Sequence, residues 1–277
     1  MQLGKVGPVD VQWVMDEMSK QGSSPRTVVQ CYRVLSRALS LAVKWRLLAV
    51  NPAKGAETPE PGKPQLNIPD SELVGRILGA ARGTAIEGPV TIGAATGLRL
   101  GEILGLTWAA VELPSDGGRG VLRLSQAVQW TSDGWSVVGP KSGHGRSVAL
   151  APSLAGWLQR HRTAQSERFL ALGQHVDVDE FVLDNGPGLS RRTDAVTRGF
   201  SDLLKASGLP HCRFHDLRHA YATTNLRAGV HPKVVSEALG HSSVLLTLDT
   251  YSHVLPDMQD RAAEAIEAAL GAAITGS

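Results

Sequence analysis

The hydrophobic and polar positions at the start of the chain predict two helices. Val9 to Met18 is a short amphipathic stretch in which apolar residues recur at helical spacing. A longer stretch opens at Ser24-Pro25, where the serine is placed to cap the helix and the proline suits its first turn. Asn51-Pro52 is expected to close this second helix, since proline cannot continue a helical hydrogen-bond ladder.

The periodicity changes in the middle of the chain. Three more helices are expected first, over residues 70–81, 89–96 and 99–106. Short stretches rich in Val, Leu and Trp then follow, separated by turn residues, over residues 121–130, 135–138 and 146–150. They predict a small three-stranded antiparallel sheet. The chain reads as mostly helical again after Pro152. The predicted fold class is therefore mainly α with a small antiparallel β-sheet (α+β).

A proline-rich stretch separates two parts of the chain. Residues 52–69 contain five prolines, together with Gly55 and Gly62, and have almost no apolar periodicity. This composition is typical of an extended linker. We therefore expect a small helical domain over residues 1–62 and a larger domain over residues 63–277.

Composition narrows the class of protein. A chain of 277 residues that is 42% hydrophobic can bury a sizeable core. No apolar run reaches the length of a membrane span, and no basic segment leads into an apolar signal core, so we expect a cytoplasmic protein without a membrane partner. Cys31 and Cys212 lack the spacing of a disulfide framework or a zinc site and are expected to be reduced thiols.

Basic residues are concentrated near the N-terminus, although the net charge is only +2. No acidic residue lies between Glu17 and Glu57. Five basic residues of this segment are candidates for contact with DNA phosphates, namely Arg26, Arg33, Arg37, Lys44 and Arg46. The charge pattern alone leaves open a second interpretation, a charged helix face that only meets solvent.

Several polar residues lie in apolar surroundings where a packed helical protein would not need them. Arg99 lies in Thr-Gly-Leu-Arg-Leu-Gly-Glu-Ile-Leu-Gly-Leu, and Glu102, three residues on, is placed to hold its guanidinium. His215 and Arg218 share one face of a second predicted helix, in His-Asp-Leu-Arg-His. Two planar guanidiniums that converge with a histidine can enclose the oxygens of a phosphodiester. A buried Arg99–Glu102 ion pair remains the alternative for the first site.

The downstream residues are ambiguous when each is taken singly. His241 follows Leu-Gly and can donate to an anion, and Tyr251 is a phenol that is a weak nucleophile unless a neighbour favours its anion. A lone tyrosine is more often a packing residue, and His219 and His253 also fit a structural role. A zinc site is disfavoured because the His and Cys spacings of this region match no usual signature.

Taken in order, these residues resemble the signature of the tyrosine recombinase and phage integrase family. The matching elements are Arg99 with Glu102, Lys141 in a hairpin, His215-x-x-Arg218, Leu-Gly-His241 and Tyr251. Lys141-Ser-Gly-His-Gly-Arg-Ser resembles the family's Lys-Thr-x-x-Ser-x-Arg pattern, and residues 27–52 are similar to the end of its helical core-binding domain. The resemblance implies a core-binding domain followed by an integrase-like catalytic domain. Only some 60 residues precede the linker, which fits a compact member or a fragment.

The resemblance also implies a mechanism. Tyr251 would attack the scissile phosphate, form a 3′-phosphotyrosyl bond and release a 5′-hydroxyl. Arg99 and Arg218 would neutralise the charge that builds on the phosphoryl oxygens. Lys141 would protonate the departing 5′-oxygen as general acid. No metal and no nucleotide cofactor is expected.

The remaining site residues receive supporting roles from the same resemblance. His215 would accept or relay the tyrosine proton, and His241 would hydrogen-bond the phosphate. Glu102 would position its neighbours, since a carboxylate facing the phosphate would repel it. Residues 249–253 are expected to give Tyr251 a short flexible approach to the phosphate.

The implied function is site-specific recombination, in phage or mobile-element integration and excision. The implied partners are double-stranded DNA, a homotetramer on synapsed sites, and accessory DNA-bending or directionality factors. A helix expected over residues 257–270 would dock on a neighbouring protomer. Two alternatives remain, a type IB topoisomerase that relaxes DNA without a specific site and a DNA-binding accessory factor that has lost catalysis.

Overall fold

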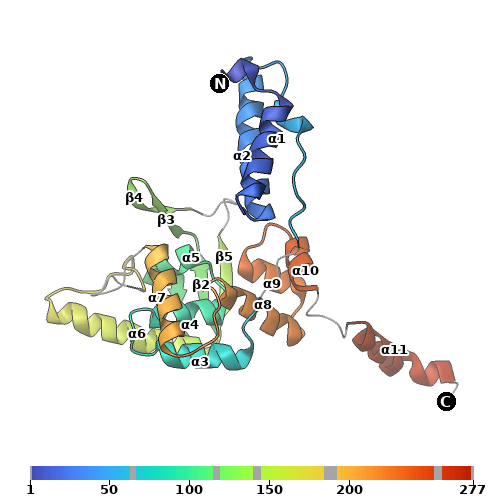
Figure 1. The fold of residues 1–277 in the computed structure, drawn as a ribbon. Helices are drawn as coiled ribbons and strands as arrows, with labels where there is room; N and C mark the ends of the chain where they lie inside the picture. Colours follow the sequence, from blue (N-terminus) through green and yellow to red (C-terminus); the bar gives the residue numbers. More distant parts are fainter. Residues whose placement is uncertain are drawn as a thin grey trace. The chain divides into compact units, whose positions relative to one another are not determined.

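Figure 1 shows the computed structural model of the chain, which describes residues 2–62, 67–114, 119–139, 145–183, 192–252 and 258–275. The chain divides into two compact units, Met1–Leu66 and Asn67–Ser277. None of the helices among the described residues is long and apolar enough to cross a membrane.

The first unit is a pair of helices with two short 3-10 turns. Its elements are η1 (Leu3–Lys5), α1 (Pro8–Lys20), α2 (Pro25–Lys44) and η2 (Pro52–Gly55). The Ser24 hydroxyl accepts a hydrogen bond from the Thr27 backbone N–H at 3.2 Å, as expected of the cap of α2. The core of the unit contains Val11, Leu39 and Ala53.

The helix α2 ends earlier than the sequence predicts. It stops at Lys44 rather than at Asn51, and Arg46 adopts a left-handed conformation with φ 59° that turns the chain away from the helix axis. The Asn51 amide instead donates to Ser40 Oγ at 2.8 Å and ties the following segment back to α2. Pro52 and Ala53 are buried, so the extended segment begins after η2 and not at Pro52.

The second unit is mainly helical, which confirms the predicted fold class. Its helices are α3 (Ser71–Ala81), α4 (Glu87–Thr96), α5 (Leu100–Leu104), η3 (Trp108–Ala110), α6 (Pro152–Ala171), α7 (Thr193–Ala206), α8 (Asp216–Arg227), α9 (Pro232–Leu239), α10 (Val244–Tyr251) and α11 (Met258–Thr275). The large core cluster includes Ile92, Ile103 and Leu217. A smaller cluster joins α8, α9 and α10 and includes Leu239 and Tyr251.

The strands form two small sheets, not the single three-stranded sheet that the sequence predicts. They are β1 (Val111–Glu112), β2 (Gly120–Leu124), β3 (Ala127–Thr131), β4 (Gly134–Val138) and β5 (Arg146–Leu150). One antiparallel sheet has the order β1-β2-β5, and β3 pairs with β4 as a separate hairpin.

The predicted strand over residues 121–130 is therefore broken, at Ser125-Gln126. Packing on α5 explains the break. The Gln126 amide donates to the Gly105 carbonyl at 2.7 Å. The backbone of β3 also lies so close to α5 that a Cβ on Gly101 would be 2.6 Å from the Val128 carbonyl oxygen. The strand β3 therefore packs against α5, and the β3–β4 hairpin is not part of the β1-β2-β5 sheet.

Candidate active site

A tight turn between α4 and α5 positions Arg99. Gly97 ends α4 with φ 65°, a conformation that favours glycine, and an added Cβ would lie 2.6 Å from Tyr221 Cδ1. Arg99 is the N-cap of α5 rather than part of the helix, and its backbone N–H donates to Glu102 Oε2 at 2.8 Å. The turn thus fixes the backbone of Arg99 beside Glu102.

The Arg99 side chain is about half exposed, with a relative accessibility of 47%. Its Nη1 donates to Glu102 Oε1 at 3.3 Å, and its Nη2 donates to the Gly240 carbonyl at 3.2 Å. A simple buried ion pair does not describe this geometry, because Glu102 is nearly buried and Arg99 is open to solvent. The guanidinium can accept an additional partner from outside.

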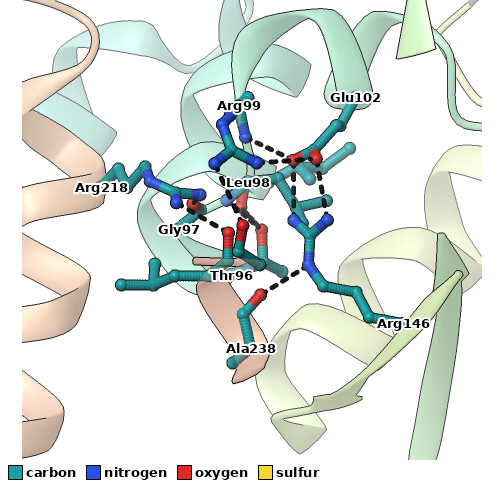
Figure 2. A network of polar contacts seen from close by, with 11 residues as sticks. Thr96, Gly97, Leu98, Arg99, Glu102, Arg146, Arg218 and Ala238 are labelled. Carbon is teal, nitrogen blue, oxygen red and sulfur yellow. Dashed lines mark hydrogen bonds and ion pairs between the residues drawn. The ribbon is translucent and has the colours of Figure 1, made fainter. Parts of the chain in front are cut away.

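Glu102 is held mainly by Arg146, the first residue of β5. Arg146 Nη1 donates to Glu102 Oε1 and Arg146 Nη2 to Glu102 Oε2, both at 2.8 Å (Figure 2). Burial alone would raise the pKa of the Glu102 carboxyl, but the hydrogen bonds and charge of Arg146, together with Arg99, bring that pKa below its usual value. Glu102 is therefore an anion shared by two cations.

Arg218 approaches the same turns from α8. Its guanidinium is buried, and it donates to the Gly97 carbonyl at 2.8 Å and to the Leu239 carbonyl at 2.7 Å (Figure 2). Burial, and next the positive charge of Arg99, lower the pKa of Arg218 to about 10, so it remains a cation at neutral pH. The structure thus brings Arg99 and Arg218, 119 residues apart in sequence, to the same pair of turns.

His215 is the N-cap residue of α8 and is exposed, and its side chain makes no capping hydrogen bond. Its ring lies edge-to-face against His219, with 5.2 Å between the ring centroids. The family resemblance implies that His215 takes the tyrosine proton, whereas in the structure the hydrogen-bond partner of the Tyr251 hydroxyl is His219, at 2.7 Å from Nδ1. Sequence periodicity gives no signal for this contact, because His219 and Tyr251 lie 32 residues apart, in two different helices.

Tyr251 is the last residue of α10 and only 1% exposed. Asp249 and Thr250, which were expected to give a flexible approach, are helical in this structure, and His253 lies outside the described residues. Burial raises the pKa of the Tyr251 hydroxyl to about 12, and the charge of Arg218 opposes this only in part. In this state the phenol is protonated and shielded from solvent.

His241 follows the C-terminal end of α9. Gly240 ends that helix with φ 64°, and His241 Nδ1 lies 2.8 Å from Thr247 Oγ1. Burial, and then the positive charges of Arg218 and Arg99, lower the pKa of His241 to about 4. His241 is accordingly neutral at pH 7 and can donate a hydrogen bond without adding charge.

Two residues of the site were not among the site residues predicted from the sequence. His219 contacts the tyrosine hydroxyl and Arg146 holds Glu102. The one sequence signal for Arg146 is its position in the segment that resembles Lys-Thr-x-x-Ser-x-Arg. The lysine of that segment, Lys141, lies outside the described residues. Among the described residues no cluster of three or more His, Cys, Asp or Glu could hold a metal ion.

The five basic residues that are candidates for DNA contact lie along α2 and just beyond it. Arg26, Arg33, Arg37 and Lys44 follow each other at steps of seven, four and seven residues, which places them on one face of the helix. All four are exposed, as is Arg46. An adjoining strip exposes apolar side chains, at Val34 and Leu41 of α2 and at its C-cap residue Trp45.

Comparison with known proteins gives consistent results. The model of the phage integrase family matches residues 80–258. The chain is 28% identical over 281 residues to "Tyrosine recombinase XerC-like" of Caldanaerobacter subterraneus subsp. tengcongensis, covering 96% of this chain and 72% of that protein. It is 30% identical over 181 residues to "ICEBs1 integrase" of Bacillus subtilis, covering 64% of this chain and 47% of that protein.

A similar fold is found among solved structures. A structure of the Tn1549 transposon integrase in complex with transposon right end DNA has a TM-score of 0.75 and 20% identity, covering 95% of this chain and 85% of that chain. The family model spans more than half of the chain and includes Arg99, Arg218, His241 and Tyr251. The chain belongs to the phage integrase family.

Proposed function

We propose that this protein is a site-specific DNA recombinase that cuts and rejoins DNA strands through a 3′-phosphotyrosyl bond at Tyr251. The observation that carries the proposal is an excess of positive charge in the network of Figure 2. Its described residues include three guanidiniums, those of Arg99, Arg146 and Arg218, but one carboxylate, that of Glu102, which binds Arg99 and Arg146. Partly buried cations without matching anions favour the binding of an anionic ligand.

A phosphodiester suits this site in shape as well as charge. Arg99 is half exposed and offers a planar fork of donors, and the planar guanidinium matches phosphate oxygens in geometry. Arg218 is fixed by two backbone carbonyls, so its charge is preorganised and needs no rearrangement as the transition state forms. His241 supplies a neutral donor beside both arginines.

The nucleophile needs a conformational step. Because Tyr251 is buried, its hydroxyl can reach a phosphate only after the side chain leaves its present position, and we propose that α10 moves when DNA binds. His219 has a pKa of about 4, mainly because it is buried, and is neutral at pH 7. Its Nδ1 can accept the phenol proton in the tautomer that carries its own proton on Nε2.

The remaining roles follow the family resemblance. Lys141 is proposed as the general acid for the 5′-oxygen, His241 as a donor to the phosphate, and His215 as a second member of the proton path next to His219. The reaction conserves the energy of the phosphodiester in the link to tyrosine, so the proposed mechanism uses neither a metal ion nor a nucleotide cofactor.

The biological setting is proposed from the relatives. An ICEBs1 integrase and a transposon integrase are named among them, which supports integration or excision of a mobile element. Double-stranded DNA is the proposed partner, and exposed basic residues on one face of α2 support a phosphate contact by the first unit. A homotetramer on two synapsed sites, with accessory DNA-bending or directionality factors, completes the proposal.

The experiment is to trap the covalent complex. Duplexes that bind the Tyr251→Phe variant are selected from a random library, and a nick is placed beside the cleaved phosphate so that the released strand end diffuses away. The wild-type chain should accumulate a covalent complex. Arg99→Ala and Arg218→Lys should form it about 10²- to 10³-fold more slowly, because a preorganised donor is lost in each.

Arg123→Ala is the matched control, since Arg123 also pairs with a glutamate, Glu112, but is exposed on β2. It should react at the wild-type rate. Relaxation of a plasmid that lacks any selected site would instead indicate a topoisomerase. Tight binding without any covalent complex would contradict the proposed activity.

A further inference from the structure

Arg146 makes polar contacts with two elements other than its own strand, α5 and α9. Besides the two bonds to Glu102, its Nε donates to the Ala238 carbonyl at 2.9 Å (Figure 2). Its guanidinium also packs against Gly240, where an added Cβ would lie 2.8 Å from Cζ. Arg146 therefore links β5 to α5 and to the C-terminal end of α9. Its contacts with α9 lie at Ala238 and Gly240, just before His241.

The contrast between Arg146 and Arg99 separates their roles. The side chain of Arg146 is 19% exposed, and each of its three nitrogens donates to a protein oxygen. Arg99 has a single, longer side-chain bond to the same carboxylate and stays 47% exposed. Arg146 binds both oxygens of the Glu102 carboxylate, whereas Arg99 has guanidinium N–H groups available to a ligand.

We propose that Arg146 is a positioning residue, which holds the Glu102 carboxylate in a bidentate pair and thereby keeps Arg99 free to bind a phosphate of the DNA. The inference rests on the proposed function, since it concerns the same site. Without Arg146, the nearly buried carboxylate has Arg99 as its remaining partner in the network. A bidentate pair with Arg99 would then neutralise that guanidinium and withdraw it from the ligand.

Substitutions at the two positions separate this role from general support of the fold. Arg146→Ala should slow covalent-complex formation at saturating DNA by about 10- to 100-fold, as is usual when an outer partner of a functional group is lost. Arg146→Lys should lie between, because an ammonium cannot hold both carboxylate oxygens and the Ala238 carbonyl in one plane. The double variant Glu102→Gln/Arg146→Ala removes the charge that would capture Arg99, and it should react at least about tenfold faster than Arg146→Ala.

The measured quantity is the single-turnover rate constant, kept apart from the final amplitude. A loss of folded protein lowers the amplitude and leaves the rate constant of the folded molecules unchanged. The positioning role lowers the rate constant, and the amplitude per folded molecule stays constant. If Arg146→Ala affects only the amplitude, or if the double variant is as slow as Arg146→Ala, the inference is wrong.

A second readout does not need catalysis. Inorganic phosphate is titrated into each variant, and the side-chain Nε–Hε signals of Arg99 and Arg218 are followed by nuclear magnetic resonance. Arg146→Ala should weaken phosphate binding at least about tenfold, and the double variant should recover it. Equal phosphate affinity in the wild type and Arg146→Ala would overturn the positioning role, even if the covalent complex still forms.

The two readouts also separate this inference from the proposed function. If the wild-type chain binds phosphate with the expected dependence on Arg146 but forms no covalent complex with DNA, the positioning role stands and the recombinase proposal fails. If phosphate shifts neither arginine signal in the wild type, the site is not an anion site and both proposals fail.

Discussion

At the scale of single residues, the candidate site holds two histidines and a tyrosine in neutral form beside fixed arginines. His219 and His241 both have a pKa of about 4, in each case mainly through burial, and the phenol of Tyr251 has a pKa of about 12. The positive charge is concentrated on the arginines instead. This arrangement suits a ligand that brings its own negative charge and a proton transfer that begins from a neutral phenol.

The lowered histidine pKa values predict a loss of stability in acid. An unfolded histidine has a pKa near 6.5, so between pH 6.5 and pH 4 the unfolded chain binds protons that the folded chain does not. The contribution of these two histidines to the free energy of unfolding is therefore fully present above about pH 6.5. It is lost as the pH decreases toward 4. The Tm of His219→Gln should fall less steeply over this range than that of the wild type, because one of these protons is lost.

His175→Gln is the matched control, because His175 is exposed in the loop after α6. Its Tm should follow the wild-type slope. If His219→Gln and His175→Gln give the same slope between pH 6.5 and pH 4, burial does not keep His219 neutral.

At the scale of elements, the sequence correctly predicts those helices whose bounds depend on local residue patterns. The helices α1, α3 and α4 lie within a few residues of their predicted bounds, because their apolar spacing and capping residues are local. The end of α2 and the split between β2 and β3 are wrong in the prediction. Both depend on tertiary contacts, of Asn51 with α2 and of β3 with α5, that no short window contains.

The same limit applies to the site. Arg99 with Glu102 is a local pair, three residues apart, and sequence identifies it. Arg146 reaches Glu102 across 44 residues and His219 reaches Tyr251 across 32, so their partners emerge only from the fold. Resemblance to a family points to the reactive residues, whereas the groups that hold them depend on packing.

The helix α2 carries a prediction about DNA affinity. Arg33→Gln with Arg37→Gln removes two charges from its basic face, and the logarithm of the affinity should then fall less steeply with the logarithm of salt, by about two units of slope. Binding of short duplexes at several salt concentrations measures this. Arg198→Gln with Lys205→Gln, two exposed residues of α7, is the control and should leave the slope unchanged. An unchanged slope in the α2 variant would remove α2 from the DNA contact.

At the scale of the whole molecule, the C-terminal helix α11 bears on assembly on DNA. The helix α11 extends five residues beyond the predicted end at Leu270, and it exposes Ile266, Leu270 and Ile274 at four-residue steps. Apolar residues at this spacing form one face of a helix. The family resemblance predicts that this face docks on a neighbouring protomer.

Deleting the residues after Pro256 should therefore weaken pairing of two DNA sites more than binding to one site. The replacement of Ile266 and Leu270 by serine should have the same effect with the helix retained. Gel mobility of single-site and paired-site complexes measures both quantities. Equal loss of the two, or a truncated chain that recombines as well as the full chain, would contradict the docking role.

The proposed mechanism is tested most directly by identifying the residue that becomes bonded to DNA. The trapped complex on the nicked duplex is digested with protease, and the peptide that carries the nucleotide is identified by mass spectrometry. The mechanism predicts a single adduct on the Tyr251 hydroxyl, and its absence in Tyr251→Phe, which still binds DNA because the ring is kept. Tyr32 and Tyr221 are the other tyrosines of the chain. An adduct on either of them, or on any other residue, would contradict the mechanism.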